Sequence, residues 1–297
     1  MNGIDYIASI LKHENVEWIS CFPSNPIISA CAKVNIRPIA FRHERGAVMA
    51  ADGYSRISMR KKFGVVAVQS QAGAENAMGG IAQAAADNIP ILILLGGNSL
   101  DQISVKPNFS AVQKYQGWVK QVEAIYSPTQ VGAVMRRAFN ALKNGPPGPV
   151  VVEMTTDVCQ QNVPEEYQNY KSPSYSLQVP NTNEIAKAIE LWQKARKPVI
   201  WAGGGVLASS GSIPLKELAE LTATPVFCTM PGKSSFDERH PLALGAGCGT
   251  TTEMAHKWLT ESDLIIALGT SLTRSPYGQK ILPNKLIIHN TIDPSDI

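Results

Sequence analysis

The fold is decided by the stretch HERGAVMAADGYSR, at residues 43–56. It follows an apolar run at residues 38–41 that is typical of a short buried strand. Small and apolar residues then recur every three or four positions, which predicts one face of a helix; they are Ala47, Ala50, Ala51, Tyr54 and Ile57. We therefore expect Glu44 in the first turn of this helix, at a strand-to-helix junction, where α/β proteins place ligands.

Glu44 has two interpretations at this point. An acid in the first turn of a helix complements the helix dipole, which is worth about 0.3–1 kcal/mol. A role in ligand binding is the alternative, and on the local pattern alone the electrostatic interpretation is favoured. A decision between the two requires features elsewhere in the chain.

Strands alternate with helices on both sides of this stretch. Between residues 3 and 154 we expect helices at 3–13, 27–32, 44–57, 76–87 and 128–143, and strands at 16–22, 37–41, 63–68, 90–95 and 150–154. Residues 96–121 are expected to be irregular or partly helical. The run at 90–95 is apolar without alternation, which indicates burial on both faces, as in a parallel sheet. Alternating strands and helices of this kind predict parallel sheets joined by right-handed crossovers.

The 297 residues are enough for two domains. We expect a first domain at 1–162, a polar linker at 163–182 and a second domain at 183–297. In the second we expect helices at 184–196, 215–221 and 252–259, and strands at 198–202, 225–228, 263–268 and 285–289. The predicted fold class is α/β, with two Rossmann-like three-layer domains, each a mainly parallel sheet with helices on both faces.

Composition excludes several classes of function. A net charge of +3 is too small to predict nucleic-acid binding, and the basic residues 60–62 are expected in a solvated loop. The five cysteines form no CxxC pair, which fits reduced thiols in a cytoplasmic protein. We see no signal peptide and no apolar run of about 18 residues, so no membrane partner is expected.

Three ordered features of the first domain carry a family resemblance. They are the turn FPSN at residues 22–25, the helix start at His43 and Glu44, and the turn SQAGAEN at residues 70–76. Together they resemble the pyrimidine-binding domain of thiamine-diphosphate-dependent enzymes of the acetolactate-synthase-like group. The second domain resembles the middle domain of that family through GGG at 203–205, PGKS at 231–234, HPL at 240–242 and SDLIIALG at 262–269.

The resemblance implies a role for Glu44. In that family a glutamate at this position hydrogen-bonds N1′ of the aminopyrimidine ring and thereby promotes loss of the thiazolium C2 proton. The resemblance also implies cofactor contacts from the backbone of Pro23 and Ser24 in the first turn. In the second turn it implies contacts from Ser70, Ala72, Gly73 and Asn76. For Asn76 a cofactor role stands beside the alternative that it caps the helix it starts.

The chain departs from the family pattern at several positions. Ser24 and Asn25 stand where the family usually has two glycines, and the usual SGPGATN is SQAGAEN here, which adds the polar bulk of Gln71 and Glu75. The Phe-Gln pair of acetolactate synthases corresponds to Phe109-Ser110, unless Gln113 replaces the glutamine. These changes point to another branch that takes a small 2-oxo-acid or acyl substrate, by decarboxylase or carboligase chemistry.

Enzymes of this family also need a third domain with Gly-Asp-Gly and Asn-Asn motifs, which bind Mg²⁺ and the diphosphate. Neither motif occurs in these 297 residues. We therefore expect this sequence to be a truncation or one subunit of a split enzyme. It would be inactive alone and would work with a separate diphosphate-binding chain or domain. The resemblance further implies active sites shared between subunits, hence a homo-oligomer, a dimer or a tetramer.

The residues 203–205 leave a second cofactor open. A glycine turn after a strand can cradle a phosphate, so FAD or ADP is possible in the middle domain. The turn lacks the G-x-G-x-x-G spacing and a clear helix start, however, and this favours a tight structural turn. Two other functions follow. One is a non-catalytic nucleotide-binding or oligomerisation module with a vestigial cofactor site. The other is a nicotinamide-dependent dehydrogenase, ranked last because the dinucleotide fingerprint is missing.

Overall fold

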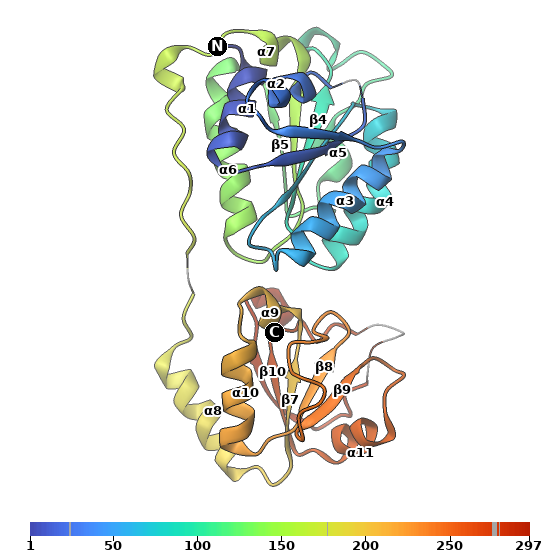
Figure 1. Cartoon of the computed structure of the whole chain (residues 1–297), viewed down its shortest axis with the longest axis vertical. Coiled ribbons are helices and arrows are strands. Elements are labelled where there is room, and N and C mark those ends of the chain that lie inside the picture. Colours follow the sequence, from blue (N-terminus) through green and yellow to red (C-terminus); the bar gives the residue numbers. More distant parts are fainter. Residues whose placement is uncertain (24, 177, 275–277, 279) are drawn as a thin grey trace. The chain divides into compact units, whose positions relative to one another are not determined.

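The computed structural model describes residues 1–23, 25–176, 178–274, 278 and 280–297 (Figure 1). The chain divides into two compact units, Met1–Ser176 and Leu177–Ile297. Residues 163–176 of the expected linker therefore cluster with the first unit, where the hydroxyl of Tyr6 accepts a hydrogen bond from the backbone N–H of Tyr170 at 3.0 Å. No described helix combines the length and the apolar character that crossing a membrane requires.

The first unit is built on a six-stranded sheet in the order β2-β1-β3-β4-β6-β5, with every strand pair parallel. Its strands are β1 (Trp18–Cys21), β2 (Arg37–Ala40), β3 (Gly64–Val68), β4 (Ile91–Gly97), β5 (Gln121–Ile125) and β6 (Val150–Thr155). Its helices are α1 (Gly3–His13), α2 (Ile27–Lys33), α3 (Glu44–Ile57), α4 (Ala72–Ala86), α5 (Ala111–Tyr115), α6 (Val131–Lys143) and α7 (Thr156–Gln160). The strand order reverses at β1, which pairs with β2 on one side and β3 on the other, so the turns after these strands meet at a topological switch point.

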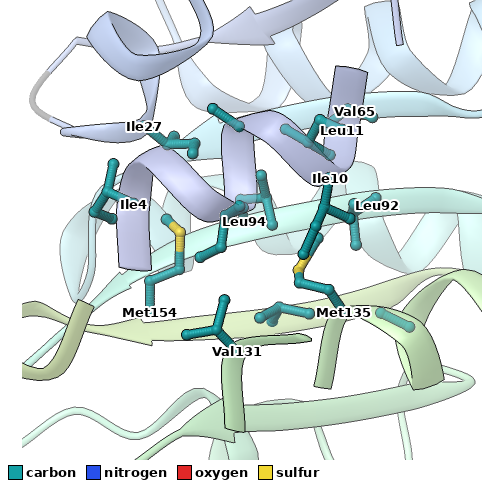
Figure 2. Packing of buried hydrophobic residues seen from close by; sticks show 14 of the residues in the cluster. Ile4, Ile10, Leu11, Ile27, Val65, Leu92, Leu94, Val131, Met135 and Met154 are labelled. Carbon is teal, nitrogen blue, oxygen red and sulfur yellow. The ribbon is translucent and has the colours of Figure 1, made fainter. Parts of the chain in front are cut away.

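Each face of this sheet carries its own apolar core. Figure 2 shows one face, where Ile4 and Leu11 of α1 and Met135 of α6 pack against Leu92 and Leu94 of β4. The other face packs against α3, α4 and α5 through a second cluster that includes Val48, Val66 and Ile93. Residues 91–95 of β4 alternate between the two clusters while all five remain buried, as expected of a central parallel strand.

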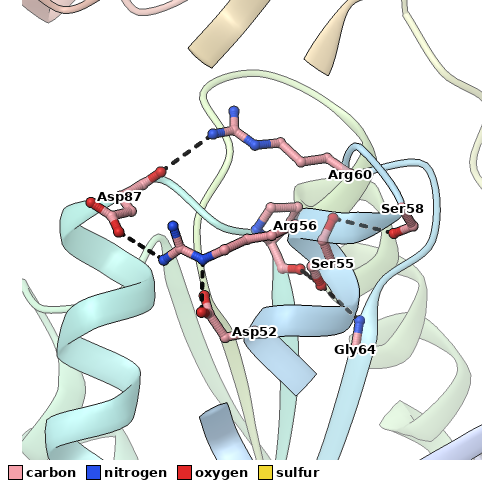
Figure 3. A network of polar contacts seen from close by, with 8 residues as sticks. Asp52, Ser55, Arg56, Ser58, Arg60, Gly64 and Asp87 are labelled. Carbon is pink, nitrogen blue, oxygen red and sulfur yellow. Dashed lines mark hydrogen bonds and ion pairs between the residues drawn. The ribbon is translucent and has the colours of Figure 1, made fainter. Parts of the chain in front are cut away.

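Polar contacts hold the carboxyl-terminal half of α3 in place (Figure 3). Arg56 of α3 bonds Asp52 on its own helix at 2.8 Å and Asp87, which directly follows α4, at 2.7 Å. Ser55, also on α3, is fully buried and accepts a hydrogen bond from the backbone N–H of Gly64 at 2.8 Å. These contacts fix α3 against α4 and β3, and therefore fix the direction in which the helix presents its first turn.

The second unit repeats the architecture with a five-stranded parallel sheet in the order β11-β10-β7-β8-β9. Its strands are β7 (Pro198–Ala202), β8 (Val226–Thr229), β9 (Ala243–Gly247), β10 (Leu264–Leu268) and β11 (Leu286–Asn290). Its helices are α8 (Thr182–Lys194), α9 (Gly204–Ala208), α10 (Ser212–Thr222) and α11 (Glu253–Glu261). Apolar clusters lie on both faces of this sheet, one including α10 and the other α11. The predicted fold class, two Rossmann-like α/β domains with parallel sheets, is confirmed.

Several elements differ from the sequence prediction. The strands β5 and β9 were not predicted, and neither was the short helix α7. The predicted lack of a helix after the glycines at 203–205 is also wrong, because the short helix α9 begins at Gly204 with Gly203 as its N-cap. The backbone N–H groups of Gly203 and Gly205 nevertheless have partners inside the chain, as described below.

Candidate functional site

Glu44 is the first residue of α3 and lies just beyond the end of β2. The preceding residue, His43, is extended and serves as the N-cap, with its ring Nδ1 accepting a hydrogen bond from the backbone N–H of Arg45 at 3.1 Å. Glu44 is only 3% exposed, whereas His43 is exposed. A carboxylate that only complemented a helix dipole would remain in solvent, so its burial indicates a second role.

Asn76 is the hydrogen-bond partner of this buried carboxylate. Its side-chain Nδ2 donates to Oε2 of Glu44 at 3.2 Å. The alternative that Asn76 caps its helix is wrong, because α4 begins at Ala72 and Asn76 lies one turn inside it. The side chain is therefore free to reach across from α4 to α3, between two helices that pack closely against each other.

Gly73 faces the other oxygen of Glu44. A Cβ atom at Gly73 would lie 3.4 Å from Oε1 of Glu44 and 2.5 Å from Cγ of Gln69. The missing side chain thus lets Cγ of Gln69 and Oε1 of Glu44 lie close to the backbone of α4. Among the described residues Oε1 has no hydrogen-bond partner, and a ring nitrogen is the kind of group that completes the bonding of such an oxygen.

The turn that leads into α4 is strained. Gln71 has φ 53° and ψ −116°, a backbone conformation that favours glycine, and its side chain makes no capping hydrogen bond. A residue held there costs on the order of 1–3 kcal/mol and is kept only when its surroundings enforce it, most often at a binding site. Ser70 and Ala72 flank this residue, and Ser70 lies against β4, since a Cβ at Gly96 would be 3.4 Å from the backbone nitrogen of Ser70.

The turn after β1 is tied to the same edge of the sheet by Asn25, which the sequence reasoning did not select as a site residue. Asn25 is 5% exposed, and its Nδ2 donates to the carbonyl oxygens of Val68 at 2.9 Å and Leu94 at 3.4 Å. Its Oδ1 accepts from the backbone N–H of Ile27 at 3.1 Å. The side chain that replaces an expected glycine therefore connects the turn after β1 to the end of β3 and to β4. A turn motif rich in Pro and Asn was the signal that could have identified it.

The remaining selected residues of this turn are Pro23 and Ser24. Pro23 lines an open pocket with Asn25, Pro38 and Ala40, and Glu44 is not among the described residues that line it. Ser24 lies outside the described residues. The structure therefore brings Glu44, Gly73 and Asn76 together directly, and places Ser70 and Ala72 in the adjoining turn.

The glycine turn of the second unit is tightly packed. A Cβ at Gly203 would lie 2.3 Å from the carbonyl oxygen of Gly269, and one at Gly205 would lie 2.7 Å from the Cα of Gly269. The backbone N–H of Gly203 donates to Leu268 at 2.9 Å, and that of Gly205 to Gly269 at 2.8 Å. These glycines allow two loops to touch, and two of their N–H groups are already used. Within the described residues, no group of three or more His, Cys, Asp or Glu side chains could hold a metal ion.

Comparisons with known proteins give matches for both units of the chain. Residues 1–124 match the family model of the thiamine pyrophosphate enzyme, N-terminal TPP binding domain, and residues 185–297 match that of the thiamine pyrophosphate enzyme, central domain. Over its whole length the chain is 34% identical to a probable acetolactate synthase large subunit of Methanococcus aeolicus, covering 51% of that protein. It is 33% identical to the corresponding protein of Methanocaldococcus jannaschii, covering 52%, and 30% identical to the acetolactate synthase large subunit of Haemophilus influenzae, covering 54%. The chain thus spans about half the length of these curated relatives.

Proposed function

We propose that this chain, which belongs to the thiamine pyrophosphate enzyme family, forms the pyrimidine-binding part of a thiamine-diphosphate-dependent decarboxylase or carboligase. Its two units are similar to the N-terminal and central domains of acetolactate synthase large subunits. The observation that carries this proposal is the buried carboxylate of Glu44, with one oxygen bonded to Asn76 and the other facing Gly73. These residues fit an aminopyrimidine ring, which offers a ring nitrogen for the carboxylate.

The cofactor, when bound, supplies a nucleophilic carbon and an electron sink for cleavage of the bond to a carboxylate. The residues of this chain would transfer a proton to or from the ring and would position the ring. Oε1 of Glu44 would hold or release a proton toward the ring nitrogen, while Asn76 fixes the carboxylate by donating to Oε2. Burial of the carboxylate would keep competing water away from that transfer.

The two turns would position the ring by their backbone. Ser70, Ala72 and Gly73 lie in the strained turn at the start of α4, beside Glu44. Pro23 lies in the turn after β1, and for Ser24 the proposal rests on the sequence alone. Parallel strands place these turns at one edge of the sheet, at its switch point.

The rest of the catalytic centre belongs to the proposal as well. We assign Mg²⁺ and the diphosphate group to a further domain, in the same polypeptide or in a separate diphosphate-binding chain, and the assembly to a dimer or tetramer. The substrate class is a small 2-oxo acid or an acyl compound. We place the enzyme in the cytoplasm because its five cysteines are free thiols.

The proposal includes no FAD or ADP at Gly203–Gly205. The backbone N–H groups of Gly203 and Gly205 donate to Leu268 and Gly269, and a Cβ at either glycine would lie within 3 Å of Gly269, so these glycines serve the contact between the two loops. The same contacts weaken the alternative of a non-catalytic nucleotide-binding module. They support a structural turn that holds the loops after β7 and β10 together.

The test is a pair of matched substitutions in the assembled enzyme, meaning this chain with its diphosphate-binding domain. We expect Glu44→Gln to lower turnover by about 10²–10⁴-fold, the usual contribution of a positioned proton donor or acceptor, while folding is preserved. Glu75→Gln is the control, because Glu75 is exposed on α4 and its carboxylate pairs with Lys114 at 3.6 Å. Unchanged turnover in Glu44→Gln would overturn the proposal.

A further inference from the structure

The short helix α5 connects the first turn of α4 to the sheet. Tyr115, the last residue of α5, is 1% exposed, and its hydroxyl donates to the backbone carbonyl of Ala74 at 2.5 Å. Ala74 follows Gly73 and precedes Asn76 by two residues. The hydroxyl therefore bonds the segment of α4 that faces Glu44.

The other end of α5 is held by a buried acid. Glu153 on β6 is 5% exposed, and its Oε2 accepts a hydrogen bond from the backbone N–H of Ala111 at 2.8 Å. Gly97 makes room for this side chain, since a Cβ there would lie 2.9 Å from Cγ of Glu153. The start of α5 is thus fixed to the sheet and its end to α4.

The first turn of α4 needs a contact of this kind. Its N-cap, Gln71, makes no side-chain capping bond and holds a strained backbone conformation. The contact from Tyr115 comes from outside the helix and from the same apolar cluster that supports α3 and α4. Burial, with a smaller contribution from Glu75, raises the pKa of Tyr115, so its hydroxyl remains a donor across the working pH range.

We propose that Tyr115 is a positioning residue, whose hydroxyl holds the first turn of α4 so that Asn76 and Gly73 keep their places against Glu44. This inference rests on the function proposed above for Glu44. Glu153 supports it by fixing the start of α5. Neither residue touches the carboxylate of Glu44, and the effect passes through the backbone of Ala74.

Tyr115→Phe tests the proposal, because it removes only the hydroxyl and leaves the ring in the core. Tyr6→Phe is the matched control. Tyr6 is also buried and its hydroxyl also makes a backbone hydrogen bond, but it belongs to the cluster on the other face of the sheet.

The first readout is amide hydrogen exchange in this chain, which reports local opening. We expect exchange of the amides at residues 76–78 to rise by about tenfold in Tyr115→Phe, the size expected for one lost hydrogen bond, and to stay unchanged in Tyr6→Phe. Equal exchange in wild type and Tyr115→Phe, or the same rise in both variants, would overturn the inference.

The second readout is the dissociation constant of thiamine diphosphate in the assembled enzyme, measured by fluorescence titration. We expect it to rise several-fold in Tyr115→Phe and to stay at the wild-type value in Tyr6→Phe. An unchanged constant in Tyr115→Phe would refute the positioning role while leaving the assignment of Glu44 intact. Failure of the Glu44→Gln test would refute that assignment, whereas the exchange result would still report whether Tyr115 holds α4.

Discussion

Ser55→Ala is the perturbation whose cost follows most directly from the structure. The hydroxyl of Ser55 is fully buried on α3 and makes two hydrogen bonds (Figure 3). It donates to the carbonyl oxygen of Pro90 at 2.7 Å and accepts from the backbone N–H of Gly64 at 2.8 Å. In Ser55→Ala the carbonyl oxygen of Pro90 and the backbone N–H of Gly64 both lose the hydroxyl as hydrogen-bond partner.

Each unsatisfied buried group costs about 1–3 kcal/mol. Two groups left by one substitution therefore lower the free energy of unfolding of the first unit by about 2–4 kcal/mol, since partial relaxation and water entry recover some of the sum. Ser58→Ala, at the C-cap of the same helix, is the control. Its hydroxyl bonds the carbonyl oxygens of Tyr54 at 2.8 Å, Ser55 at 3.2 Å and Lys62 at 2.9 Å, but Ser58 is only half-buried, so water can replace these contacts.

The assay is urea denaturation followed through 5-fluorotryptophan at Trp18, whose ring packs edge-on against Tyr54 of α3 with centroids 5.1 Å apart. A site-specific probe is needed because two units can unfold separately. We expect Ser55→Ala to shift the transition by the amount above and Ser58→Ala to shift it by less than about 1 kcal/mol. A loss below about 0.5 kcal/mol in Ser55→Ala would refute the reasoning, because ordinary surface substitutions have effects of that size.

Three further predictions concern packing and pH. A Cβ at Gly64 would lie 2.1 Å from the carbonyl oxygen of Ala51, so Gly64→Ala should destabilise the first unit by about 3 kcal/mol or more in the same assay. Burial raises the pKa of Glu153, against the opposing effect of backbone N–H groups such as that of Ala111. The folded state therefore holds the proton more tightly than the unfolded chain, and stability falls as the pH rises from the ordinary pKa through the raised one. Glu153→Gln should remove that fall in a series of thermal melts between pH 4 and pH 7, and an undiminished fall would contradict the assignment. Gly203→Ala would place a methyl group 2.3 Å from a carbonyl oxygen of the loop after β10, so a normal melting temperature of the second unit would contradict the close packing described there.

Periodicity predicted the helices and strands whose own residues show a clear apolar pattern. The buried strand β4 is continuously apolar, and α3 shows its apolar face at helical spacing, so both were found from the sequence. β5 reads QVEAI, with its first three residues only half-buried, and gives no apolar run. β9 reads ALGAG and pairs with β8 through a register shift. Its small residues, at the edge of the sheet, give no strand pattern in the sequence, so this strand was not predicted.

The site was predictable only where one motif contained it. The position of Glu44 at the start of a helix followed from the stretch at residues 43–56. The carbonyl groups that accept hydrogen bonds from Asn25 and Tyr115 lie more than 40 residues away in the chain, and local pattern carries no information about them. The bond between Asn76 and Glu44 likewise depends on where α4 begins, which helix periodicity places only within a few residues.

The measurement that tests the central claim most directly is hydrogen–deuterium exchange at C2 of thiamine diphosphate, followed by proton NMR in the assembled enzyme without substrate. It isolates the proton transfer assigned to Glu44 from substrate choice and product release. The account predicts fast exchange with the wild-type chain and with Glu75→Gln, and exchange slower by about 10²-fold or more with Glu44→Gln. Equal exchange rates in all three proteins would contradict it.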